Sequence, residues 1–250
     1  MAPDDGTDDL RSPRCIFSEV VRNVIVTIDG PAGSGKSTTA RGVAEELGFV
    51  YLDTGAMYRA VALGFLRANT RPSSEGAQEV LPSIEVDVKY QDDAMHVFLN
   101  GEDVTGRIRT PEVGAVVSDI SILRAVRERM VREQRRIGFD KEETHGGVVL
   151  DGRDTGTVVF PDAPVKIFME ADLDERARRR QKEYAEEGEE VTFEEVRQEI
   201  AQRDRKDRNR EIAPLRRADD AIPLDSTNRT IENQIAFVVD RVKESQELGT

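Results

Sequence analysis

The stretch from Val24 to Thr39 most constrains what this chain can fold into. It reads VIVTIDGPAGSGKSTT, and residues 30–37 fit the pattern G-x-x-x-x-G-K-[ST] at every fixed position. Glycines in such a loop allow backbone N–H groups to wrap closely around a phosphate, because no Cβ atom stands in the way. The apolar run before the loop predicts a short buried strand, and apolar residues spaced i, i+3, i+4 and i+7 from Ala40 predict a helix directly after it.

Strand, loop and helix together predict a site for the phosphates of a nucleoside triphosphate, and the flanking elements count against a chance match to a glycine-rich turn. Lys36 supplies a positive charge for the β- and γ-phosphates and is a candidate catalytic residue. The hydroxyl of Ser37 can ligate Mg²⁺. The residues expected at the nucleotide are Gly30, Pro31, Ala32, Gly33, Ser34, Gly35, Lys36, Ser37 and Thr38.

Composition excludes several classes of protein. The formal net charge is −13, and such a surface repels nucleic-acid phosphates. No apolar run approaches the roughly 18 residues that a membrane helix needs. The acidic N-terminus lacks a hydrophobic signal segment, and the single Cys15 fits a reducing compartment. We therefore expect a cytoplasmic protein with no nucleic-acid or membrane partner.

Short apolar strands alternate with helical patterns along the chain. The expected strands are 24–28, 49–52, 146–150, 165–169 and 221–224. Helices are expected from the loop to Gly48, at 57–64, from Pro111 to Gly138, at 176–184, at 193–208 and at the C-terminal end, where Ser226 or Thr227 can provide the cap. This order predicts an α/β fold with a parallel sheet of about five strands and helices on both faces.

One segment departs from this pattern. From Ile84 to Leu99 apolar residues recur at every second position, and Asn100-Gly101 is a turn signal. That pattern predicts a small antiparallel hairpin or three-stranded sheet inserted between elements of another class. Residues 70–76 carry Gly, Ser and Pro and are expected to form a loop, and the acidic residues 1–22 are expected to be a disordered leader.

Four segments resemble one known family. They read IDGPAGSGKST, LDTGAMYR, DGRDTGTVVFPDAPVKIF and RDRKDRNREIAPL, and the likeness extends from Val24 to about residue 242. The chain resembles the bacterial cytidylate kinases, which belong to the nucleoside monophosphate kinase superfamily of P-loop kinases. The resemblance implies transfer of the γ-phosphoryl of ATP to CMP or dCMP with Mg²⁺, as part of pyrimidine nucleotide metabolism. It also implies that the inserted sheet belongs to the monophosphate-binding region.

Phosphoryl transfer between two nucleotides brings several negative charges together, so positioning and electrostatics supply most of the catalysis. Arginine suits this task because its planar fork grips phosphate in bidentate fashion. The resemblance assigns Arg59, Arg153 and Arg210 to the acceptor phosphate, with Arg153 and Arg210 as catalytic residues beside Lys36. The residues that it implies at CMP are Thr54, Arg59, Ser118, Arg127, Arg153, Asp154, Arg203, Asp207 and Arg210.

Three carboxylates allow two interpretations each. Asp154 is expected at the cytosine amine, or as a structural partner of Arg153. Asp207 lies one helical turn after Arg203, so the two residues either hold the ribose hydroxyls, as the resemblance implies, or form an i,i+4 ion pair. Asp151 closes a buried strand, where it can orient waters on Mg²⁺ or cap a helix.

The resemblance also divides the chain. It implies a single kinase domain over 23–250, with a core of 23–53, 140–178 and 209–250, a monophosphate-binding region of 54–139 and a lid at about 179–208. The six arginines expected around the lid are Arg176, Arg178, Arg179, Arg180, Arg205 and Arg208. Most should pair with neighbouring glutamates and one or two should reach ATP.

Other functions remain as alternatives. A GTP-dependent switch would need the guanine-reading pattern N/T-K-x-D, which the sequence lacks. A non-catalytic nucleotide-binding protein would have no use for a second set of phosphate-binding arginines. Within enzymes, a kinase for UMP or AMP is the alternative. We expect the protein to act as a monomer.

Overall fold

The computed structural model describes residues 23–91, 94–186 and 188–247, so the expected leader of residues 1–22 and Cys15 lie outside the described residues. Within the described part, no helix is both long enough and apolar enough to cross a lipid bilayer.

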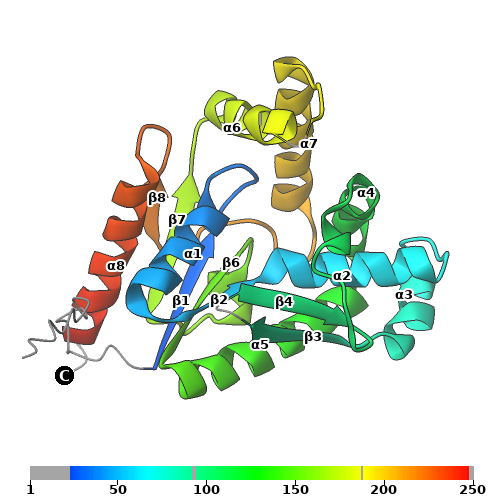
Figure 1. The fold of residues 1–250 in the computed structure, drawn as a ribbon, viewed down its shortest axis with the longest axis horizontal. Helices are drawn as coiled ribbons and strands as arrows, with labels where there is room; N and C mark the ends of the chain where they lie inside the picture. The colour runs from blue at the N-terminus through cyan, green and yellow to red at the C-terminus, as the bar shows by residue number, and fades with distance from the viewer. Residues whose placement is uncertain (1–22, 92–93, 187, 248–250) are drawn as a thin grey trace, which may run out of the picture.

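A five-stranded sheet with the order β2-β6-β1-β7-β8 forms the centre of the fold (Figure 1). Its strands are β1 (Val24–Asp29), β2 (Val50–Asp53), β6 (Gly147–Gly152), β7 (Val165–Glu170) and β8 (Ile222–Asp225). Every neighbouring pair is parallel, with Val26 opposite both Val149 and Val165. The predicted α/β class, the parallel sheet and the five strands are therefore confirmed.

Helices cover both faces of this sheet. The helices on these two faces include α1 (Lys36–Leu47), α2 (Thr54–Arg67), α5 (Arg124–His145) and α8 (Ile231–Glu247). Side chains alternate along β1, so Val26 packs in a cluster with Val43 of α1 and Val238 of α8, whereas Ile25 packs in a second cluster with Met130 of α5. A strand buried on both faces reads as a continuous apolar run, which is why β1 could be predicted.

The inserted sheet is also present. It has three antiparallel strands in the order β3-β4-β5, formed by β3 (Val86–Gln91), β4 (Ala94–Leu99) and β5 (Glu102–Asp103). Val97 and Leu99 share a core cluster with Phe65 of α2, so the insert is packed against the domain through one face. The shorter helices around it are α3 (Ser74–Val80), η1 (Leu81–Ser83), η2 (Arg107–Arg109) and α4 (Pro111–Ile120).

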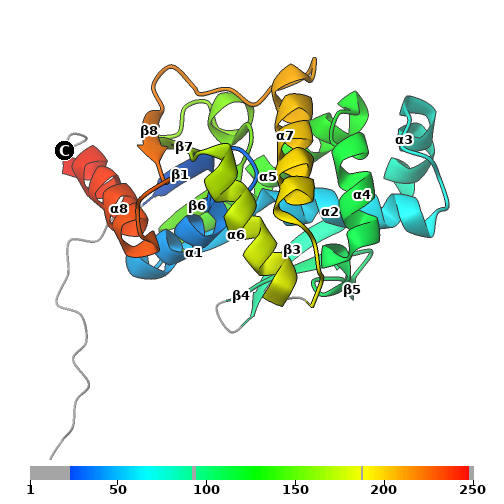
Figure 2. The same cartoon turned by 90° about the horizontal axis from the view of Figure 1, so that it is seen from above.

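Two helices stand over the carboxyl ends of the central strands. They are α6 (Leu173–Glu186) and α7 (Phe193–Asn209), and a small core of their own joins them through Ala177, Val196 and Ile200. Seen from above, α7 lies between α6 and α4 (Figure 2). A π-helical turn, η3 (Thr155–Val159), follows β6.

Some predicted helix boundaries were wrong. The expected loop at 70–76 ends early, because Ser73 accepts a hydrogen bond from the backbone of Gly76 and starts α3 at Ser74. The helix expected to end at Gly138 continues to His145. The ring of Phe160 packs so closely on Gly138 that a Cβ atom there would lie 2.5 Å from Phe160 Cζ. Gly138 therefore serves close packing and does not end the helix.

The predicted cap of the C-terminal helix was also wrong. The Ser226 hydroxyl donates to the carbonyl of Ser34 at 2.8 Å, and the Thr227 hydroxyl bonds Asp225 at 2.6 Å. Thr230 takes the capping role, since its Oγ1 accepts from the backbone of Asn233 at 3.3 Å. Ser226 instead ties the last strand to the phosphate loop.

The acidic surface leads to a prediction on stability. With a net charge of −13, the carboxylates in excess repel one another in the folded state. We expect the melting temperature to rise with potassium chloride, because salt screens this repulsion over about 8–10 Å. Thermal melts over a series of salt concentrations measure the effect, with a neutral osmolyte as the control. A melting temperature that falls steadily as salt is added would contradict it.

Candidate active site

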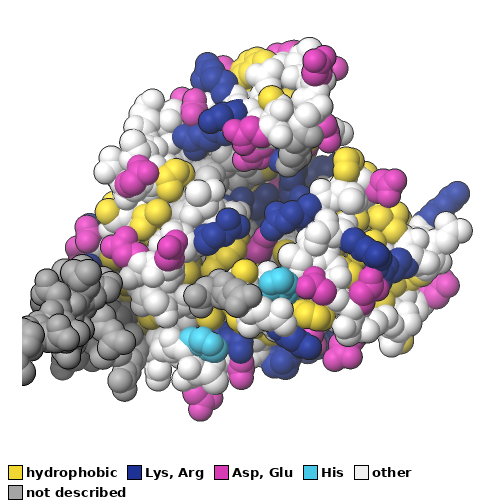
Figure 3. All heavy atoms as spheres, viewed as in Figure 1, with side chains coloured by type: hydrophobic (Ala, Val, Ile, Leu, Met, Phe, Trp, Pro, Cys, Tyr) yellow, Lys and Arg dark blue, Asp and Glu magenta, His cyan; other side chains and the backbone are white. Residues whose placement is uncertain are grey.

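A cavity of about 300 Å³ opens where the carboxyl ends of β1, β2 and β6 face α6 and α7. Lys and Arg side chains gather around this hollow in the middle of the molecule (Figure 3). Residues expected at the triphosphate that line it are Ala32, Gly33, Gly35, Lys36, Ser37 and Thr38. Those expected at the acceptor that line it are Thr54, Arg59, Ser118, Arg127, Arg153, Asp154, Arg203, Asp207 and Arg210, and Asp151 lines it as well.

The loop after β1 has the geometry that its glycines predict. Gly33 and Gly35 have φ angles of 73° and 86°, in the left-handed region that favours glycine. Gly30 and Ser34 do not line the cavity. A Cβ atom on Gly30 would lie 2.3 Å from the carbonyl oxygen of Met169, and Ser34 is fully buried. These two residues shape the loop from behind and do not line the cavity.

Lys36 is the first residue of α1 and is buried in the loop. Its ammonium donates to the carbonyl of Pro31 at 3.1 Å. Pro31 therefore contacts the lysine of its own loop, and it does not line the cavity. Burial and the nearby charge of Arg153 lower the pKa of Lys36 to about 7. Bound phosphates would restore the charge, since an anion favours the protonated amine.

Asp151 lies next to the last residue of β6 and faces the same loop. Its Oδ2 accepts from the Ser37 hydroxyl at 2.6 Å, and its Oδ1 accepts from the Tyr51 hydroxyl at 2.8 Å. Burial, reinforced by the charge of Asp53, raises the pKa of Asp151. The alternative that Asp151 caps a helix was wrong, because both of its carboxylate oxygens accept from side-chain hydroxyls and not from the backbone of a helix terminus.

These contacts fit a magnesium site. A hydroxyl and a carboxylate are hard oxygen donors of the kind that Mg²⁺ prefers. Among the described residues, no group of three or more His, Cys, Asp or Glu could hold a metal ion. Mg²⁺ in nucleotide sites takes one or two protein oxygens and completes its shell with phosphates and water, so the pair of Ser37 and Asp151 is sufficient.

The end of the cavity away from the phosphate loop is a network of ion pairs, of which those of Asp154 with Arg127 and Arg210 are buried. Asp154 accepts from Arg127 through one oxygen and from Arg210 through the other, the latter at 3.3 Å. Arg153 turns away from Asp154 and donates to Asp207 of α7 at 2.9 Å. The alternative that Asp154 is the partner of Arg153 was therefore wrong, and so was an ion pair between Asp207 and Arg203 as the main contact of Asp207.

Burial and neighbouring charges shift the pKa values of several residues in this network. Burial lowers the pKa of Arg203 to about 10, with the charge of Arg153 as the second cause. Burial would raise the pKa of Asp207, but the charges of Arg153 and Arg203 outweigh it and lower that pKa. Burial also lowers the pKa of Arg59 and Arg210. Burial and the charges of neighbouring arginines both disfavour the charged forms of these guanidinium groups, and a bound anion would favour them.

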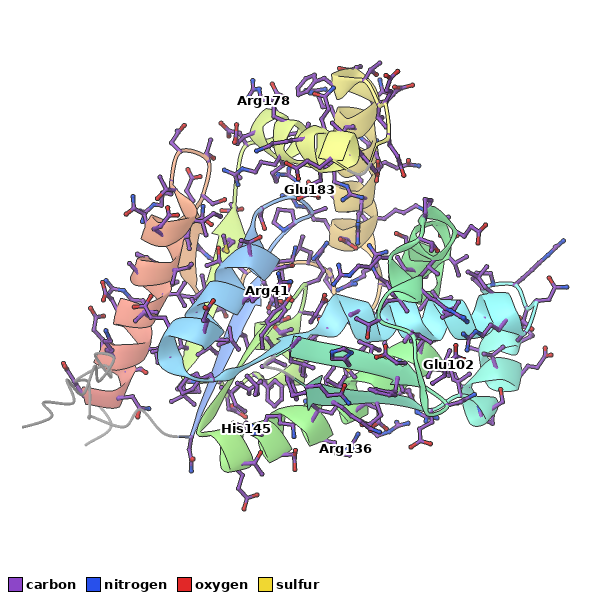
Figure 4. The ribbon with its side chains drawn as sticks, in the orientation of Figure 1. Arg41, Glu102, Arg136, His145, Arg178 and Glu183 are labelled. Atoms are coloured by element: carbon purple, nitrogen blue, oxygen red, sulfur yellow. The ribbon has the colours of Figure 1, made fainter. Side chains whose placement is uncertain are left out.

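The arginines of α6 differ in what they contact. Arg176 is buried and donates to Asp204 of α7 at 2.7 Å and to the carbonyl of Ala32 at 3.1 Å. Arg178 points away from the cavity, whereas Glu183 faces it (Figure 4). Arg180 also lines the cavity, and it pairs with Glu183 at 2.8 Å.

The expectation of glutamate pairing therefore fits Arg178 and Arg180, and also Arg179, which pairs with Glu175 at 3.0 Å. Arg180 is the one of the six that lines the cavity. Arg205 and Arg208 are exposed on α7 and do not line it.

Several cavity residues were not expected from the sequence: Asp53, Gly55, Tyr58, Arg109, Val117, Ser121, Glu183, Glu199 and Ile200. Tyr58 could have been found, because it precedes Arg59 in the segment LDTGAMYR. Glu183 and Glu199 lie in helices so rich in charge that no pattern distinguishes them from solvated residues.

The fold and the site define a class of protein. A phosphate loop lies between β1 and α1, a second cluster of cations lies across one cavity from it, and two helices stand over both. This is the architecture of a P-loop kinase, a phosphotransferase that places two phosphorylated substrates side by side.

Comparison with known proteins narrows the class. The sequence model of the family described as cytidylate kinase matches residues 26–244. Cytidylate kinase of Salinibacter ruber is 68% identical over 227 residues, covering 91% of this chain and all of that protein. Those of Citrifermentans bemidjiense and Bacillus cytotoxicus are 46% and 45% identical, covering 88% and 90% of this chain and 93% and 98% of theirs. The chain belongs to the cytidylate kinase family.

Proposed function

We propose that this protein transfers the γ-phosphoryl of ATP to CMP or dCMP, giving ADP and CDP or dCDP, in pyrimidine nucleotide metabolism. The observation that carries the proposal is that one cavity is bounded at one end by the phosphate loop and at the other by the residues expected at CMP. ATP lies along the loop from Gly33 to Thr38, and CMP lies between α4, α5 and α7. The experiment that tests it is a titration of ADP formation against CMP, dCMP, UMP, AMP and GMP.

The chemistry in this proposal is alignment and charge stabilisation. Lys36 contacts the β- and γ-phosphates, and Arg59, Arg153 and Arg210 contact the phosphate of CMP. The acceptor phosphate is itself the nucleophile, so no covalent phosphoenzyme forms. Fixed cations that face charge developing in the transition state lower the barrier because they need no reorganisation. Arg203 and Asp207 take the ribose hydroxyls.

Ser37 and Asp151 are the residues that would hold Mg²⁺, through the hydroxyl directly and through water on the carboxylate. When bound, the ion neutralises charge on the β- and γ-phosphates of ATP. The contact of 2.6 Å between Ser37 Oγ and Asp151 Oδ2 already brings the two donors together.

The choice of base follows from hydrogen-bond polarity. Cytosine has an amino donor at N4 and acceptors at N3 and O2, whereas uracil has an acceptor at O4 and a donor at N3. Asp154 accepts from N4 of cytosine, and Arg127 donates to N3 or O2. The hydroxyl of Ser118 can either donate or accept a hydrogen bond at the base. Arg127 and Arg210 fix the Asp154 carboxylate from both sides, and each of its oxygens retains acceptor capacity.

This proposal makes a prediction for Asp154→Asn. The amide can rotate and donate to O4 of uracil, so we expect activity on CMP to fall and the preference for CMP over UMP to narrow by about ten- to a hundredfold. The measurement is kcat/KM for both substrates on both proteins. Asp119→Asn is the matched control, because that carboxylate lies on α4 and is paired with Lys206 on the surface at 3.4 Å. An unchanged ratio would remove Asp154 from base recognition.

We propose the following parts for the molecule: a core of 23–53, 140–178 and 209–250, a monophosphate-binding region of 54–139 and a lid of about 179–208, all in one kinase domain over 23–250. Closure of the lid over the transferring phosphate excludes water and suppresses hydrolysis of ATP. We further propose a cytoplasmic monomer with no nucleic-acid or membrane partner. Light scattering coupled to gel filtration tests the monomer, with a mass near 27.9 kDa as the expected result.

A further inference from the structure

Asp29 is a buried carboxylate that does not line the cavity. It is the last residue of β1 and directly precedes the phosphate loop, and only 4% of its surface is exposed. It accepts three hydrogen bonds from the segment after β6: from the backbone of Thr155 at 2.9 Å, from the Thr155 hydroxyl at 2.8 Å and from the backbone of Gly156 at 2.8 Å. Within the described part of the chain, no ion pair neutralises this carboxylate, so its partners are all donors of one short segment.

The segment that Asp29 holds is the one that carries the acceptor residues. Arg153 and Asp154 directly precede Thr155, and both line the cavity. The segment also approaches β1 very closely. A Cβ atom on Gly156 would lie 2.8 Å from the hydroxyl of Thr27 in β1. Within the segment itself, a Cβ atom on Gly152 would lie 2.6 Å from Thr155 Cγ2. The backbone at these positions has little freedom to shift once Asp29 has bound it.

Burying the ionised carboxylate of Asp29 costs free energy. Burial raises the pKa of Asp29 to about 6, even though the bonds from Gly156 and Thr155 act in the opposite direction. A buried ionised group is generally less favourable than a well-packed apolar residue of similar volume. Packing of the core alone therefore does not account for an aspartate at this position.

Building on the proposed function, we propose that Asp29 is a positioning residue for the acceptor. It fixes Arg153 and Asp154 relative to the phosphate loop, so that the phosphate of CMP meets the γ-phosphate of ATP in line. Asp29 is well placed for this because one end of β1 leads into the loop that binds ATP, and its side chain holds the segment that binds CMP. It acts through these residues and touches neither nucleotide.

The direct test is Asp29→Asn. The amide oxygen can still accept from Thr155, but the amide nitrogen then faces the N–H of Gly156, donor against donor. We expect KM for CMP, and the dissociation constant of CMP measured by calorimetry, to rise about ten- to a hundredfold. KM for ATP should stay within about twofold of wild type, because the phosphate loop keeps its own contacts. A variant that folds and binds CMP as wild type does would overturn the proposal.

Thr155 gives a second test if Asp29→Asn does not fold. Thr155→Val removes the hydroxyl donor and keeps the shape, and Thr155→Ser keeps the donor, so we expect a several-fold loss of CMP affinity in the first and recovery in the second. Thr157→Val is the matched control, since that hydroxyl lies in the same η3 turn and finds no partner among the described residues. Equal CMP affinity in the Val and Ser variants of Thr155 would contradict the proposal.

These experiments separate the inference from the proposed function. If wild type neither binds nor phosphorylates CMP, the proposed function is wrong and the role of Asp29 with it. If wild type phosphorylates CMP and Asp29→Asn loses only thermal stability, with both KM values unchanged, the function stands and Asp29 is structural alone.

Discussion

Replacing Lys36 by Ala should lower the turnover of CMP at least about a hundredfold, because the transition state loses a fixed cation next to the transferring phosphoryl. Lys36 is buried and bonds the carbonyl of Pro31 at 3.1 Å, so it is held in the loop before substrate arrives. The rate of ADP formation at saturating CMP and ATP measures the loss.

Two controls make the Lys36 result interpretable. Lys182→Ala removes a lysine from the exposed side of α6, where its pair with Glu186 is 3.8 Å long, and should leave turnover unchanged. A thermal melt of Lys36→Ala then shows whether the fold is intact. Near-normal turnover in a folded Lys36→Ala protein would mean that the loop is not the catalytic phosphate site.

Arg153→Ala should damage both KM for CMP and turnover, with a combined loss in kcat/KM of about a hundredfold or more. Two causes add. The acceptor phosphate loses a charge-assisted contact in both the ground state and the transition state. Asp207 also loses the partner that it holds at 2.9 Å, so a partly buried carboxylate is left without its main ion pair. The affinity for ATP should change little.

The comparison for Arg153 is Arg178→Ala, on the outer side of α6, where the ion pair with Glu175 is 3.3 Å long. That variant should keep wild-type values of both kcat and KM. If Arg153→Ala loses ATP binding and keeps CMP binding, the arginine has been assigned to the wrong nucleotide. Arg59→Ala and Arg210→Ala should likewise lower turnover and weaken CMP binding, and should change the affinity for ATP little.

The sequence was most informative where one residue type is required by geometry. Gly33 and Gly35 could be placed because a phosphate loop needs left-handed backbone there, and β1 because a strand buried on both faces is apolar throughout. Arg153, which the resemblance assigned to the acceptor phosphate, follows the end of β6 and lines the cavity.

The partners of these residues could not be predicted in the same way. Asp207 pairs with Arg153, which is 54 positions away in the chain, whereas spacing along one helix suggested Arg203. Asp29 was not singled out at all, because its role depends on how closely the segment after β6 approaches β1. Spacing along the sequence indicates which residues are neighbours on one helix or strand. Ion pairs between different helices and strands depend on the tertiary fold.

One residue, Arg176, joins α6 and α7 to the phosphate loop. Arg176 lies near the start of α6 and binds both Asp204, near the end of α7, and the carbonyl of Ala32 in the phosphate loop. The start of α6 and the last turns of α7 are therefore held at the phosphate loop, and the opposite ends of the two helices, at Glu186 and Phe193, lie far from this contact. In the lid closure that we propose, Arg176 is the fulcrum of a lever. A small tilt there then sweeps the far ends of the two helices through a longer arc, carrying Arg180, one turn beyond the fulcrum, only a short way.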